Sequence, residues 1–175
     1  MYIHIDSKHY LNSGMVVEKE PYSENELILP EMRALLPSDF YPHIVDIAQN
    51  GLSLWGFAAL TVQKGGLDII TRMRELTFEM YRWRHCHDKP SRLQSFFAWI
   101  DIEDARKFRA IHGGRLFEVK AASNMPDFIA DENVFNSGDA SKYWTGRSLS
   151  NDKYYQPAKE CLLTLPILVL REIEN

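Results

Sequence analysis

The sequence predicts an α+β fold, because segments with strand periodicity stand near both ends of the chain and helical segments fill most of its middle. The clearest evidence is a strand–helix–strand unit within Pro90–Ala121. Ser95–Ile100 is an apolar run of strand length, and Arg115–Ala121 alternates as a strand with one buried face does. Between these strands, residues 101–112 carry the signals of a helix.

That helix has a clear start, face and end. Asp101 is expected to cap it, since a carboxylate before the first turn accepts bonds from unpaired backbone amides. Gly113 should end it, because glycine tolerates the backbone conformation that helix ends often require. Apolar residues recur at spacings of three and predict one buried face, made of Ile102, Ala105, Phe108 and Ile111.

Two strands are predicted before this unit, near the start of the chain. Tyr2–Ile5 reads as a short strand with His4 on one face and its isoleucines on the other. A turn over 12–14 leads to a second short strand at 15–17. The acidic stretch 18–37 contains three prolines, which favours a loop with one short helix.

The middle of the chain is predicted to be mostly helical. Residues 39–50 favour a helix that ends at Gly51, whereas 52–62 is apolar throughout, so it should be buried as either a helix or a strand. After Gly65–Gly66 a helix is expected that ends near His85. Its predicted buried stripe consists of Leu67, Ile70, Met73, Leu76, Thr77, Met80 and Tyr81.

The last third of the chain is predicted to return to strands. Residues 123–138 are polar and acidic, which indicates a loop, and 139–144 favour a short helix. After a second loop at 147–155, the apolar segments 159–165 and 167–173 are expected to be strands separated by a proline.

Length and composition predict one domain over residues 1–175, with a mostly helical insertion at about 30–88. The chain is 45% apolar and 25% charged, as ordinary globular proteins are. Two cysteines and no secretory signal favour the cytoplasm, and no apolar run is long enough for a membrane span. A net charge of -4 argues against binding a polyanion over the whole surface, although a local basic groove stays open.

Three polar features could carry chemistry. Glu160 is a carboxylate at the head of an apolar strand, where it could stabilise a cationic centre or simply be the polar entry to the strand. His4 could bond a ligand hydroxyl or phosphate, or be a half-buried structural residue. Arg92, three residues before Ser95, could bind a phosphate or form a surface ion pair.

A group of histidines with one cysteine, and a group of arginines, could also bind a ligand, and each has a simpler explanation. His85, Cys86, His87 and the distant His112 lack the spacing of a zinc site, so no metal is expected. The arginines between residues 72 and 92 form a basic segment. It could guide a nucleic acid, or it could be an ordinary solvated helix face.

Four segments together resemble the ADP-ribosyltransferase superfamily, especially small bacterial members. They are an early strand with a histidine, Tyr2-Ile3-His4; the strand Phe96-Phe97-Ala98 with the following IEDARKF; the segment DASKYWTG; and the late strand KECLLTLPILV. The resemblance covers the first dozen residues and the chain from about Pro90 onward, and its specificity lies in the order of the segments. It implies a split two-sheet β core with a helical middle segment.

The resemblance implies NAD as substrate, with Glu160 bonding the 2′-hydroxyl of the nicotinamide ribose and stabilising the charge as nicotinamide leaves. His4 would bond the adenosine ribose, Arg92 would meet the pyrophosphate, and Phe96 with Tyr143 or Trp144 would sandwich the nicotinamide. The superfamily has a histidine subclass and an arginine–serine–glutamate subclass. In the second of these, Ser95 would be the family serine. Phe96 stands where the histidine subclass has tyrosine, and the first strand lacks the arginine of the serine subclass, so the subclass stays open.

The expected function is therefore a mono-ADP-ribosyltransferase that modifies a protein, RNA or DNA, of a type found among bacterial toxins. Such a toxin would have an antitoxin protein as partner. Two alternatives stay open: a catalytically inactive transferase fold that serves as a binding module, and a nucleic-acid-binding domain that uses the arginine-rich helix.

Overall fold

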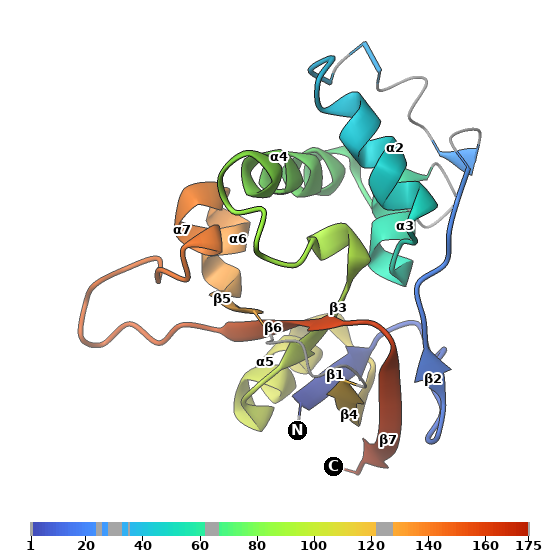
Figure 1. The fold of residues 1–175 in the computed structure, drawn as a ribbon. Coiled ribbons are helices and arrows are strands. Elements are labelled where there is room, and N and C mark those ends of the chain that lie inside the picture. Colours follow the sequence, from blue (N-terminus) through green and yellow to red (C-terminus); the bar gives the residue numbers. More distant parts are fainter. Residues whose placement is uncertain are drawn as a thin grey trace. The chain divides into compact units, whose positions relative to one another are not determined.

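The computed structural model describes residues 2–23, 26–27, 33–34, 36–61, 67–121 and 128–174 of the 175-residue chain. It divides into two compact units (Figure 1). The sheet unit consists of Met1–Glu18 and Phe97–Asn175, and the helical unit is Lys19–Phe96. The α+β class is confirmed. The helical unit spans the whole of the segment 30–88 that is predicted to be a helical insertion.

Seven strands form one sheet in the order β2-β7-β4-β1-β3-β6-β5, and the pairs β1/β3, β1/β4, β2/β7, β4/β7 and β5/β6 are antiparallel. The expectation of two separate sheets is therefore not met by the described strands. Their bounds are β1 Tyr2–Asp6, β2 Val16–Val17, β3 Ser95–Trp99, β4 Arg115–Ala121, β5 Phe128–Asp131, β6 Lys159–Thr164 and β7 Ile167–Ile173. The predicted strands of the chain are confirmed with small shifts at their ends.

Helix α5 (Ile102–His112) packs on one face of the central strands. Oδ1 of Asp101 accepts a bond from the Glu103 amide (2.6 Å), and Gly113 ends the helix with a φ of 72°, so both predicted boundaries are confirmed. Ala105 is fully buried beside Ile3 and Trp99, whereas Ile111 is 78% exposed. The predicted buried face was therefore one residue too long, because the last turn extends beyond the strands.

Two predictions about the sheet unit are wrong. Strand β4 is buried on both faces over residues 116–119, whereas its alternation predicted one buried face. The loop predicted over 123–138 contains β5 and the helix α6 (Glu132–Ser137). Phe128, Val134 and Phe135 are buried there, which outweighs the polar composition of the segment. Residues 122–127 lie outside the described part.

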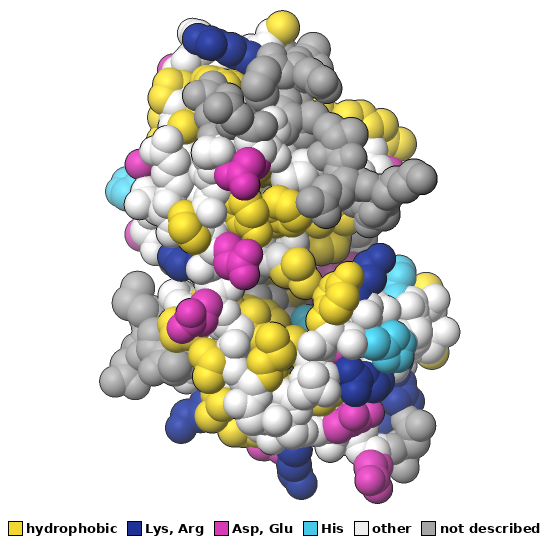
Figure 2. All heavy atoms as spheres, turned by 90° about the vertical axis from the view of Figure 1, so that its right-hand side faces the viewer, with side chains coloured by type: hydrophobic (Ala, Val, Ile, Leu, Met, Phe, Trp, Pro, Cys, Tyr) yellow, Lys and Arg dark blue, Asp and Glu magenta, His cyan; other side chains and the backbone are white. Residues whose placement is uncertain are grey.

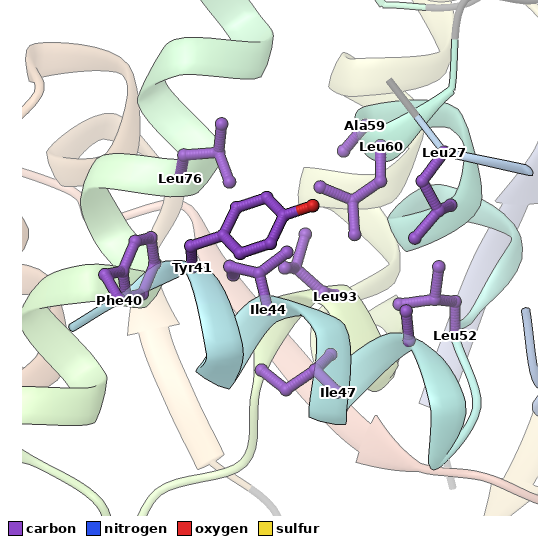
Figure 3. Close-up of a cluster of buried hydrophobic side chains, with 11 residues drawn as sticks. Leu27, Phe40, Tyr41, Ile44, Ile47, Leu52, Ala59, Leu60, Leu76 and Leu93 are labelled. Atoms are coloured by element: carbon purple, nitrogen blue, oxygen red, sulfur yellow. The ribbon is translucent and has the colours of Figure 1, made fainter. Parts of the chain in front are cut away.

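The helical unit contains α2 (Tyr41–Gln49), α3 (Leu54–Leu60), α4 (Ile69–His85) and the 3₁₀ turn η2 (Arg92–Gln94). Its core gathers apolar side chains from all of them. Figure 3 shows Tyr41 and Ile44 of α2 directed toward Leu60 of α3 and Leu93 of η2. The helices predicted over 39–50 and up to His85 are confirmed, and the ambiguous segment 52–62 is a helix over Leu54–Leu60.

Close backbone contact fixes α3 against η2. A Cβ atom on Gly56 would come within 1.9 Å of the Leu93 carbonyl oxygen, so only glycine fits at this position. Leu54, at the start of the same helix, is 61% exposed, which corrects the expectation that the whole segment is buried. The predicted Gly65–Gly66 boundary lies outside the described residues.

Helix α4 buries only part of the predicted stripe: Leu76 is buried and Met80 packs against the core, whereas Met73 is exposed. Ile70 is 68% exposed, although the apolar spacing placed it in the buried stripe. The buried residues of α4 are Arg72, Glu75, Leu76, Phe78, Glu79 and Arg82. Periodicity failed here because buried charges that bind one another replace apolar residues along the inner face. Within the described residues, no helix has the length and apolar character needed to cross a membrane.

Candidate active site

Glu160 lies near the start of β6 with only 6% of its surface exposed. Its Oε1 accepts a hydrogen bond of 2.7 Å from the hydroxyl of Tyr143. Across the antiparallel pair, Ala130 of β5 stands directly opposite Glu160. Since opposed residues share a face of the sheet, the small alanine leaves room for the carboxylate and the phenol beside it.

Tyr143 belongs to α7 (Ala140–Trp144), the short helix predicted over 139–144. Asp139 caps this helix by accepting a bond from the Lys142 amide (2.9 Å). The cap fixes where α7 begins and thereby turns Tyr143 inward. The Tyr143 ring meets Phe128, Phe135 and Trp144 edge to face, at centroid distances of 5.8, 6.1 and 5.0 Å.

The rings of Tyr143 and Trp144 were expected to sandwich a nicotinamide. They are 0% and 1% exposed, and Trp144 stacks on Phe128 at 5.2 Å. In this arrangement the rings are part of the core of the sheet unit and offer no open face to a ligand. The expected stacking role is therefore corrected: Tyr143 binds Glu160 instead, and Trp144 supports the packing of α7 on β5.

His4 is held by its neighbouring strand. Its Nδ1 lies 2.7 Å from the carbonyl oxygen of Phe97. A carbonyl can only accept, so Nδ1 carries the proton. Burial lowers the pKa of His4 below its usual value of 6.5, and it outweighs the opposing effects of the Phe97 bond and the charge of Asp6. Near neutral pH the ring is thus uncharged and Nε2 is a hydrogen-bond acceptor.

His4 and Glu160 share one side of the sheet. Ile3 pairs with Trp99, which contacts Phe108 of α5, so His4 points away from α5. The Glu160 face carries α7, and Figure 1 shows α5 on one side of the sheet with α6 and α7 on the other. One strand, β3, separates β1 from β6, which corresponds to about 10 Å between their backbones.

Arg92 and Ser95 belong to the helical unit, where both are buried at 2% exposure. The Arg92 guanidinium binds Glu75 at two points, Nε to Oε2 at 2.9 Å and Nη2 to Oε1 at 3.0 Å. The Ser95 hydroxyl donates to the Ser91 carbonyl at 2.6 Å. These contacts give both residues structural roles, which corrects the expected contact of Arg92 with a pyrophosphate.

Phe96 is the last residue of the helical unit and is 9% exposed. By alternation along β3 it shares a face with Ala98, opposite to Phe97 and Trp99. Its predicted stacking on nicotinamide stays a prediction.

The helical unit holds a buried charge network that the sequence did not predict. Glu75 binds Arg92 and also accepts a bond from Nε1 of Trp55 (2.8 Å). Glu79 binds Arg82 at 2.6 Å, Nε2 of His43 at 3.0 Å and the Ser91 hydroxyl at 2.8 Å. Burial would raise the pKa of Glu79, but these partners outweigh it, so the pKa is lowered.

This network also corrects the interpretation of the basic segment. Arg72, Arg82 and Arg92 are buried rather than presented to solvent, and exposed Arg84 pairs with Asp39 at 3.0 Å. Figure 2 shows acidic, basic and hydrophobic side chains interspersed on the one face that it draws. The segment therefore offers a nucleic acid far fewer cations than the sequence suggested.

A second carboxylate, Asp131, organises the loop that precedes β6. Oδ2 accepts bonds from the Tyr155 hydroxyl (2.6 Å) and the Leu149 amide (3.2 Å), and Oδ1 from the amides of Asn133 and Ala158. These bonds tie the segment 149–158 to the end of β5. Asp131 is not among the predicted site residues, although its place before a helical turn could have marked it as a cap.

A groove of about 710 Å³ lies elsewhere on the sheet unit, along β1, β4, β7 and the start of α5. Its charged lining consists of Asp101, Glu118, Arg171, Glu172 and Glu174. This acidic lining repels the pyrophosphate of a dinucleotide, so the groove is not part of the candidate site. Among the described residues, no cluster of three or more histidine, cysteine, aspartate or glutamate side chains has the arrangement of a metal site.

The fold and the site define an α+β protein with an antiparallel sheet and a buried carboxylate held by a tyrosine. The chain belongs to the family described as "Protein of unknown function (DUF2441)", whose model matches residues 2–175. No match to this chain was found among curated proteins.

Proposed function

We propose that this protein is a mono-ADP-ribosyltransferase, which cleaves NAD and transfers ADP-ribose to a protein, RNA or DNA. The observation that carries the proposal is the buried Glu160 carboxylate, bound by Tyr143 on the side of the sheet that His4 also faces. The resemblance of four segments of the sequence to that superfamily supports the same assignment, and the toxin role and the antitoxin partner belong to it.

In the proposed reaction, Glu160 is the catalytic residue. The bond between the nicotinamide nitrogen and C1′ of its ribose breaks, and the electron pair leaves with nicotinamide. The ribose becomes oxocarbenium-like, and the carboxylate stabilises this charge while it accepts a bond from the 2′-hydroxyl. A nucleophile of the acceptor then attacks C1′ and releases its proton to solvent. Burial strengthens the electrostatic contribution, because the local dielectric constant is low.

His4 fits the role of a ribose ligand in this proposal. Its neutral ring, with the proton on Nδ1, leaves Nε2 as an acceptor for a hydroxyl of the adenosine ribose. Phe96 would stack on the nicotinamide through its ring face, which needs no hydroxyl. Arg92, Ser95 and Trp144 have structural contacts and take no part in the proposed binding.

The test compares the parental protein with Glu160→Gln, which keeps the size of the side chain and removes its charge. We expect the parental protein to release nicotinamide from NAD and to label a macromolecule in cell lysate with radiolabelled ADP-ribose. Glu160→Gln should lower both activities at least about 100-fold, since loss of one electrostatic group in an active site costs about that factor. Protease and nuclease digestion of the labelled product identifies the acceptor class.

The matched control is Glu103→Gln, an exposed glutamate on α5 that pairs with Arg106. It should retain the parental activity. Equal nicotinamide release by the parental protein and by folded Glu160→Gln would contradict the assignment of Glu160.

A second candidate function is a binding module without turnover. The burial of Tyr143 and Trp144 favours it, because two rings expected at the cofactor are part of the core instead. Calorimetric titration with NAD distinguishes the two: a module binds an intact ligand without releasing nicotinamide, whereas the transferase consumes NAD.

A further inference from the structure

We infer that Tyr143 is the positioning residue of Glu160: its hydroxyl holds the carboxylate in the orientation that the transfer requires. The inference rests on the proposed function and deepens it. It assigns the phenol to the catalytic carboxylate instead of to the nicotinamide.

The position of the Tyr143 hydroxyl is fixed by its surroundings. Its ring is fully buried and meets three aromatic rings edge to face, so the side chain has no room for another rotamer. The hydroxyl therefore occupies one point, 2.7 Å from Oε1 of Glu160. A donor that needs no reorganisation during the reaction gives the largest electrostatic benefit.

The test is Tyr143→Phe, which removes one oxygen and keeps the ring in its packing. We expect kcat for NAD cleavage to fall about 10- to 100-fold with little change in KM, since a hydrogen bond to a charged group has about that effect. The ¹³C resonance of the Glu160 carboxyl, recorded by NMR without NAD, should change its chemical shift, because the carboxylate loses the hydroxyl that donates to it.

Tyr155→Phe is the matched control, because it removes a phenol hydroxyl from the carboxylate of Asp131 instead. It should leave the Glu160 resonance in place. An unchanged Glu160 resonance in folded Tyr143→Phe overturns the positioning role, whether or not the protein is active. If the resonance changes in Tyr143→Phe but the parental protein releases no nicotinamide, the contact is supported and only the transferase function is overturned.

Discussion

In the helical unit, the buried carboxylates of α4 accept bonds from arginines, whereas Glu160 and Asp131 in the sheet unit accept bonds from tyrosine hydroxyls. A guanidinium cancels the charge of the carboxylate that it binds, which suits a structural role in a low-dielectric interior. A phenol holds a carboxylate in place without adding a charge of its own. This difference is why we place the proposed chemistry at Glu160 rather than in the larger charge network of α4.

The largest expected effect is at the arginine contact. Arg92→Met leaves Glu75 buried without its guanidinium and should lower the free energy of unfolding by about 3–5 kcal/mol. Urea denaturation measures the change. The double variant Glu75→Met with Arg92→Met should recover most of the loss, because it leaves no uncompensated charge.

The control for this prediction is the exposed pair of α5, Glu103 and Arg106. Arg106→Met should change the free energy of unfolding by less than about 1 kcal/mol, since exposed ion pairs contribute little. Equal losses for Arg92→Met and Arg106→Met would show that the α4 network is not what stabilises the helical unit.

The next largest effect tests which face of α4 is buried. Leu76 is 2% exposed and belongs to the core of the helical unit, so Leu76→Ala should cost about 2–5 kcal/mol. Ile70→Ala, on the same helix but 68% exposed, should stay within about 0.5 kcal/mol. Thermal and urea unfolding of both variants measure the difference; a large cost at Ile70 would contradict the observed face.

The smallest expected effect concerns the pH dependence of the sheet unit. The pKa of His4 is lowered by burial from 6.5, so between that value and the folded-state pKa the unfolded chain binds more protons than the folded protein. The contribution of His4 therefore makes the free energy of unfolding fall as the pH drops through this window. His4→Gln should flatten the plot of the free energy of unfolding against pH there.

Urea unfolding at several pH values below 7 measures this slope. Asp6 provides a comparison in the same strand. Burial would raise its pKa, but bonds from Leu11, Tyr10 and Arg115 outweigh it, so the pKa is lowered from 3.8. Its contribution is lost only as the pH falls below 3.8 toward the lower folded-state value. Because the charge of His4 helps to lower the pKa of Asp6, His4→Gln should also weaken this contribution.

Local signals predicted most of the elements of the sheet unit. The cap at Asp101, the stop at Gly113 and the strand alternation around them each depend on a few neighbouring residues, and the structure confirms them. The same reasoning failed where burial depends on distant partners. Ile70 belongs to a regular apolar stripe, yet it is exposed, while Glu75, Glu79 and Arg82 of the same helix are buried.

In the candidate site, too, the sequence predicted what depends on neighbouring residues and not what depends on distant ones. The sequence marked Glu160 and His4 as ionisable groups on strands, because a charged residue within an apolar pattern is visible locally. It could not assign the hydroxyl of Tyr143 to Glu160, since 17 residues separate them and only the packing of α7 on β5 and β6 brings them together.

Caps, turns and alternation act through neighbouring residues, so the sequence predicted most of the strands and helices, although not β5 and α6. Only the tertiary structure decided which charges are buried and which donor each carboxylate binds. Those choices depend on side chains that lie far apart along the chain, and burial makes every unmatched polar group costly.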